Sequence, residues 1–98
     1  MKKFKVQLHG RNFLLNVDGE PGKFGFHATR FVIAENPQEA GKIAVILIHQ
    51  SPVLRDMVIN ESSDRSIIEL VEIRAVNWFT FLAKKSTKDI TFYAEDET

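Results

Sequence analysis

The sequence predicts a two-layer α+β domain, in which one main helix packs on one face of an antiparallel sheet of about five strands. An apolar strand at 23–34 leads into an amphipathic helix at 37–50, and the flanking segments alternate in polarity. Short connections join the first three strands, so the predicted order is strand, strand, strand, helix, strand, strand. Because the chain has 98 residues, we expect residues 1–98 to form a single domain.

Three residues mark the start of the helix. Asn36 occupies the N-cap, Pro37 the first helical position and Glu39 the third, where its carboxylate can reach back to the amide of Asn36. This arrangement is a capping box with Asn in the place of Ser or Thr. We therefore expect the helix to begin at Pro37.

One face of the helix is apolar along its whole length. The residues at the helical spacing are Ala40, Ile43, Ala44, Leu47 and Ile48. We expect the sheet to cover this face. Val45 and Ile46 widen the apolar surface, which leaves two interpretations: a rim of the core under the following loop, or a contact between subunits through Gly41 and Val45. We favour the rim.

The first 17 residues contain two short alternating segments. Their apolar residues are Phe4, Val6 and Leu8, and then Phe13, Leu15 and Val17. Gly10 and Arg11 lie between the two segments and permit a tight reversal, so we expect the segments to pair as an antiparallel hairpin. The run DGEPG at 18–22 is the clearest turn signal in the chain and leads into the strand at 23–34.

The strand at 23–34 changes its apolar register partway along. The even positions Phe24, Phe26 and Ala28 are apolar, followed by the odd positions Phe31 and Ile33. A bulge or bend near Thr29 and Arg30 would reconcile the two registers. Alternatively, Val32 and Ala34 keep the even parity and Phe31 faces the other side.

The second half of the chain contains weaker signals. Ser51 and Pro52 predict a short helical turn that ends at Met57 or Val58. The polar segment 60–66 is typical of a loop, and 67–76 is rich in β-branched residues and predicts a strand. The aromatic segment 78–82 either continues that strand or closes the core. A basic turn at 84–88 precedes a final strand at 90–94.

Composition excludes several classes of protein. The formal net charge is zero, so the chain lacks the bulk charge that draws strongly basic domains to nucleic acid or to anionic membranes. It has no cysteine, which excludes disulfides and thiolate chemistry. No window is long and apolar enough to span a membrane. We expect a cytoplasmic protein with no membrane partner.

Residues that could carry chemistry are scattered in the sequence. His9, His27 and His49 lack the close spacing of metal ligands, so we interpret them as ordinary imidazoles and expect no metal site. The serines match no nucleophile motif, and the glycines open no phosphate-binding helix. We therefore expect no cofactor and no enzymatic activity.

One stretch resembles the RNA-recognition motif. The run KFGF at 23–26, followed by ENPQEAGKIA at 35–44, looks like the third strand and second helix of that family. This resemblance implies that Phe24 and Phe26 stack on bases and that Lys23 and Arg30 contact phosphates. A complete motif also needs a strand, a helix and a strand before this point, for which the first 22 residues have no room. We interpret Phe24 and Phe26 as core residues instead.

The strings GRNFLL at 10–15 and GFHATRFVIA at 25–34, with the capped helix, resemble a group of small bacterial proteins of unknown function. The resemblance implies a compact bacterial α+β domain and transfers no site. The function we expect first is a non-catalytic binding or protein-interaction module that forms a homodimer or docks on a protein partner. The alternative is a domain that binds single-stranded nucleic acid through the KFGF strand.

Overall fold

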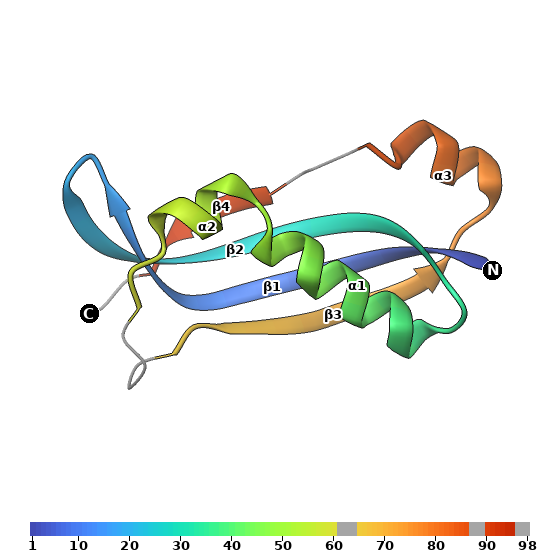
Figure 1. Ribbon diagram of the computed structural model, residues 1–98, viewed down its shortest axis with the longest axis horizontal. Coiled ribbons are helices and arrows are strands. Elements are labelled where there is room, and N and C mark those ends of the chain that lie inside the picture. The colour runs from blue at the N-terminus through green and yellow to red at the C-terminus, as the bar shows by residue number, and fades with distance from the viewer. Residues whose placement is uncertain (61–64, 87–89, 96–98) are drawn as a thin grey trace.

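The computed structural model describes residues 1–60, 65–86 and 90–95, apart from the side chains of Val17, Val53 and Met57. The elements in chain order are β1 (Lys2–Val17), β2 (Glu20–Ala34), α1 (Pro37–His49), α2 (Pro52–Met57), β3 (Ile67–Ala75), α3 (Trp78–Lys84) and β4 (Ile90–Ala94). The described residues form an elongated body of 42 × 24 × 24 Å whose long axis follows the two long strands (Figure 1).

The described strands form one antiparallel sheet in the order β3-β1-β2-β4. The fold class is the expected α+β, but this sheet has four strands instead of about five. The prediction of a hairpin with a reversal at Gly10 and Arg11 was wrong, because both segments belong to the single strand β1. The turn in the DGEPG run lies at Asp18 and Gly19, which both adopt positive φ angles of 53° and 83°. Two such residues are what a tight hairpin turn between twisted strands requires.

A bulge in β1 takes the place of the predicted reversal. Gly10 pairs with Phe26 and Phe13 pairs with Phe24, so Arg11 and Asn12 together face one residue of β2. Asn12 adopts a positive φ of 59°, which an Asn tolerates better than most residues. The bulge moves the buried positions of β1 from even to odd numbers, and both sets therefore point to the same core.

The register of β2 follows the second alternative for this strand. Its pairing with β1 runs without a shift from Ala34 to Phe26, so the bulge near Thr29 and Arg30 is not present. Val32 and Ala34 stay on the buried face, and Phe31 faces the other side of the sheet. Phe31 is nevertheless buried, which explains why its apolar character gave a misleading signal of a register change.

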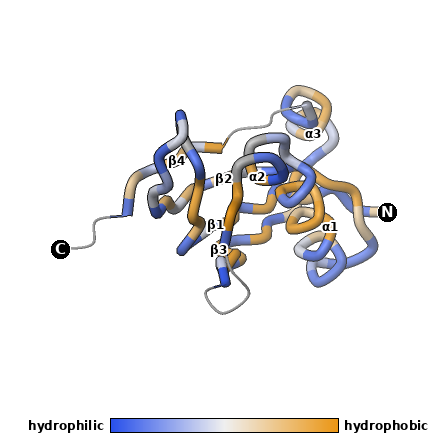
Figure 2. The backbone as a smooth tube through the Cα atoms, turned by 60° about the vertical axis from the view of Figure 1, so that its left-hand side comes forward, coloured by the Kyte–Doolittle hydropathy of each residue, from blue (hydrophilic) through white to orange (hydrophobic). Residues whose placement is uncertain are grey.

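The core lies between the sheet and the two helices α1 and α2 (Figure 1). At its centre the ring of Phe26 packs against Phe13 and Phe92, with centroids 5.1 Å and 5.7 Å away. Figure 2 shows the apolar segments of β1, β2 and α1 gathered in this layer. The expected stripe of α1 is buried at Ala40, Ala44 and Ile48 and partly buried at Ile43, whereas Leu47 lies at the exposed margin.

Helices α1 and α3 each begin directly after an asparagine whose side chain caps the first turn. Asn36 accepts a hydrogen bond from the amide of Glu39 at 2.8 Å, as expected, but the carboxylate of Glu39 accepts from the amide of Glu35 instead of Asn36. The short helix α2 was also expected. The aromatic segment after β3 forms a helix, α3, which the sequence reading missed; Asn77 caps it by accepting from Thr80 at 2.8 Å. No helix in the described ranges has the length and hydropathy needed to cross a bilayer.

Candidate functional site

The outer strand β3 and the helix α1 together form an exposed apolar surface. Among the described residues, β3 pairs on one side only, with β1, so its other edge carries backbone groups that no strand satisfies. Helix α1 packs across β1, β2 and β3 on the core face of the sheet. The free edge and the helix therefore meet at one margin of the molecule (Figure 1).

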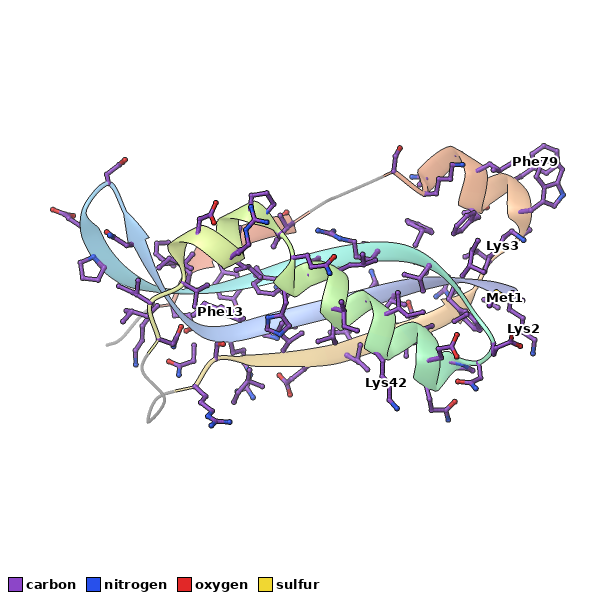
Figure 3. All side chains as sticks on the ribbon, viewed as in Figure 1. Met1, Lys2, Lys3, Phe13, Lys42 and Phe79 are labelled. Atoms are coloured by element: carbon purple, nitrogen blue, oxygen red, sulfur yellow. The ribbon has the colours of Figure 1, made fainter. Side chains whose placement is uncertain are left out.

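A shallow depression of about 570 Å³ lies at this margin. It is lined by Gln38, Gly41, Lys42, Val45, Ile46 and Leu70. Ile46 is 55% exposed and Leu70 is 47% exposed. The side chain of Lys42 extends past the β3 margin in Figure 3, and the other side chains around the depression are mostly apolar. The two residues proposed for a subunit contact, Gly41 and Val45, thus lie in one surface with an exposed residue of β3.

Gly41 sets the distance between the helix and the strand. A Cβ atom at this position would lie 2.8 Å from Cδ1 of Leu70 and 3.3 Å from Cδ1 of Ile73. The missing side chain therefore lets α1 approach β3 closely at Leu70 and Ile73. Val45 packs partly against the core, as the rim interpretation predicted, while its neighbour Ile46 remains in solvent.

The opposite face of β3 carries charge. Glu72 and Arg74 form an ion pair of 2.9 Å along the strand, with both side chains substantially exposed. A register shift in the pairing between β1 and β3 leaves Val71 without a partner on β1, and Val71 is 63% exposed. The free edge is thus apolar on the helix side and charged on the other side.

A separate polar cluster lies on the face of the sheet opposite α1. The rings of His9 and His27 stack with their centroids 4.7 Å apart, and Nε2 of His9 is hydrogen-bonded to the hydroxyl of Tyr93 at 2.5 Å. Glu69 lies 3.9 Å from His9 and pairs with Arg11 at 2.8 Å. In the part of the chain that the structure describes, no group of three or more His, Cys, Asp or Glu residues could hold a metal ion.

The interpretation of the histidines as ordinary imidazoles did not include this cluster, because His9 and His27 have no close spacing in the sequence. An uninterrupted hairpin with its turn at Asp18 and Gly19 would set His9 opposite Ala28; the bulge in β1 shifts the pairing by one residue, to His27. The switch of apolar residues from even to odd positions along β1 was the available signal, but it was interpreted as a chain reversal. His49 lies on α1, away from the other two histidines.

The structure does not assemble the nucleic-acid site suggested by the KFGF strand. Phe26 is fully buried and Phe24 packs partly against the core, so both are core residues as we expected and Phe26 offers no face to a base. Arg30 is also buried, and its guanidinium donates to the carbonyl of Thr29 at 2.8 Å. Lys23 lies opposite Leu14 on the other face of the sheet. An open stacking platform would require exposed aromatics.

Comparison of the chain with models of protein families, with curated proteins and with solved structures found no match in any of the three.

Proposed function

We propose that this protein is a non-catalytic interaction module that self-associates, with two copies joined through β3 and the depression beside α1. The observation that carries the proposal is the free edge of β3 lying next to an apolar depression. An unpaired strand edge is a template for another strand, and exposed apolar side chains beside it add a hydrophobic contribution. The proposal includes a cytoplasmic location, which the absence of cysteine favours.

The strand sequence restricts how two copies can pair. In a symmetric antiparallel pair, the central residue of one copy lies opposite the same residue of the other copy. The residue after the centre in one copy then lies opposite the residue before the centre in the other. Centring the pair on Glu69, Glu72 or Arg74 would set like charges directly opposite one another, which is unfavourable. If the pair were centred on Leu70 or Val71, Glu72 of one copy would lie opposite Ile68 or Leu70 of the other. These side chains point to different faces of the sheet, because the register shifts at Val71.

A pair centred on Ile73 avoids both problems. It sets Glu72 of each copy opposite Arg74 of the other, so two ion pairs form across the interface on the charged face. On the helix face, Gly41 brings α1 close to Leu70 and Ile73, so the helix of each copy lies beside the symmetry axis. The two depressions then lie on either side of the symmetry axis, because Leu70 of each copy is opposite Val76 of the other, and each borders the other copy at the end of its β3.

Sedimentation equilibrium over a range of protein concentrations tests this proposal. We expect a reversible dimer for the natural chain. Ile46→Asp should raise the dimer dissociation constant by more than about tenfold, because each copy loses a buried apolar contact and places a charge in the depression. The matched control is Ile59→Asp, another exposed isoleucine that lies beside Leu14 and outside this surface.

Two outcomes would contradict the proposal. One is a strict monomer at all concentrations. The other is a dimer that Ile46→Asp leaves intact, since that dimer would use a different surface. Circular dichroism of both variants should match the natural chain, because both side chains are exposed.

A further inference from the structure

Helix α3 exposes three large apolar side chains at one end of the molecule. Phe79 is 70% exposed, Trp78 54% and Leu82 49%, and the rings of Trp78 and Phe79 stack with centroids 4.2 Å apart. Positions 78, 79 and 82 fall on one side of a helix. Figure 2 shows apolar colour in α3, well apart from the core layer. This surface therefore contributes nothing to the main core.

The exposed rings are held in place by several contacts. Asn77 caps the helix, the amide of Val76 donates to the carbonyl of Lys3 at 2.9 Å, and Phe81 is buried. These contacts fix α3 against the start of β1 and point Trp78 and Phe79 outward. The apolar exposure is thus a property of the folded chain.

Lysines lie near both ends of α3. Lys2 and Lys3 lie at the same end of the molecule as Phe79 in Figure 3, whereas Lys84 and Lys85 belong to the last turn of α3, where Lys85 also lines a depression with Leu47. Two carboxylates also lie towards this end, because Glu35 follows the β2 partner of Lys2 and its amide donates to Glu39. The four lysines outnumber them, although the whole chain has a formal net charge of zero. We call these seven residues the aromatic tip: Trp78, Phe79, Leu82, Lys2, Lys3, Lys84 and Lys85.

We propose that the aromatic tip binds the surface of a lipid bilayer that contains anionic lipids. Trp and Phe side chains enter the interfacial region of a bilayer, while lysines near them contact anionic headgroups. A second copy of the chain is the weaker candidate for this surface, because a symmetric contact would bring two sets of lysines together. The tip also lies at one end of a body 42 Å long, which suits contact with a flat surface.

The expectation of no membrane partner depends on two properties of the whole chain. These are its zero net charge and the lack of a segment that could span a membrane. Neither property describes a local patch. A tip with three exposed apolar residues and four lysines needs no spanning segment, because it lies in the interface without crossing the bilayer.

The single tryptophan of the chain reports directly on this surface. We would titrate the protein with vesicles of phosphatidylcholine alone and with vesicles that also contain phosphatidylglycerol. We expect the emission of Trp78 to shift to shorter wavelength and the protein to sediment with the anionic vesicles. Binding should weaken as salt is added, because the lysine contacts are screened.

Two variants separate the apolar and the charged contributions. Phe79→Ser combined with Leu82→Ser should lower the affinity for anionic vesicles by more than about tenfold. Lys84→Glu combined with Lys85→Glu should remove the preference for anionic over neutral vesicles. Ile59→Ser, a change at an exposed isoleucine outside the tip, should bind as the natural chain does.

The proposal would be overturned if anionic vesicles left the emission unchanged and did not sediment the protein. It would equally be overturned if binding to neutral vesicles were as tight, or if both tip variants bound like the natural chain. A shift that depended on protein concentration without lipid would assign the tip to a contact between copies. Circular dichroism confirms that each variant is folded, and all four substituted tip residues are exposed.

Discussion

Gly10 is a buried position of β1 where only glycine fits. A Cβ atom there would overlap the ring of Phe26, which is fully buried and has no room to move. We expect Gly10→Ala to lower the free energy of unfolding by about 2 kcal/mol, measured by urea denaturation.

A double-mutant cycle identifies the cause of that loss. Phe26→Leu removes the ring, so the penalty of Gly10→Ala should be smaller in that background than in the natural chain. Strictly additive effects of the two substitutions would show that the ring of Phe26 is not what excludes a side chain at Gly10.

Asn60 holds the bulge of β1 through two hydrogen bonds. Its side chain donates to the carbonyl of Asn12 at 2.9 Å and accepts from the amide of Leu14 at 2.9 Å. Asn60→Ala leaves two partly buried backbone groups without these partners, so we expect a loss of about 1–3 kcal/mol in the free energy of unfolding. Asn16→Ala, at an exposed position of the same strand, should change it by less than about 0.5 kcal/mol. Equal effects of the two changes would contradict this role.

At the scale of the elements, the start of α1 depends on a single side chain. Asn36→Ala removes the acceptor of the Glu39 amide and should lower the free energy of unfolding by about 1 kcal/mol. Gln38→Ala provides the comparison below the dimer dissociation constant, because Gln38 is exposed and lies in the same turn without capping it, although it also lines the depression. Thermal unfolding followed by circular dichroism measures both. A loss for Gln38→Ala as large as that for Asn36→Ala would refute the assignment of the cap.

The elements with local chemical signals could be predicted from the sequence. The capped helix α1, the short helix α2, the turn at Asp18 and Gly19 and the strands β3 and β4 all agree with the structure within a few residues. Each depends on neighbours in the chain, such as an Asn-Pro cap or a β-branched run.

The features that depend on distant residues could not be predicted. The bulge in β1 is held by Asn60 and by Glu95, which accepts from the amide of Asn12 at 3.0 Å, and neither contact has a local signature. The stacking of His9 and His27 follows from that bulge. Helix α3 was not predicted, because its aromatic residues favour strands. In the folded chain the Asn77 cap and the burial of Phe81 stabilise the helix instead.

At the scale of the whole molecule, the two proposed surfaces share no residue. The self-association surface lies along β3 and α1, and the aromatic tip lies at the end that carries α3 (Figure 1). Variants in one surface should therefore leave the other unaffected. We expect each copy of the Ile46→Asp variant to bind anionic vesicles with the affinity of the natural chain. Vesicle sedimentation at protein concentrations below the dimer dissociation constant measures this affinity.

The charge order of β3 tests whether two copies pair through this strand with Ile73 at the symmetry axis. Glu72→Arg and Arg74→Glu should each weaken self-association by about tenfold or more, because each sets like charges opposite one another twice. Native mass spectrometry of an equimolar mixture of the two variants is the measurement. We expect the mixture to form the mixed dimer in preference to either homodimer, since opposite charges then face each other at both positions. A statistical mixture of dimers, or no dimer at all, would contradict it.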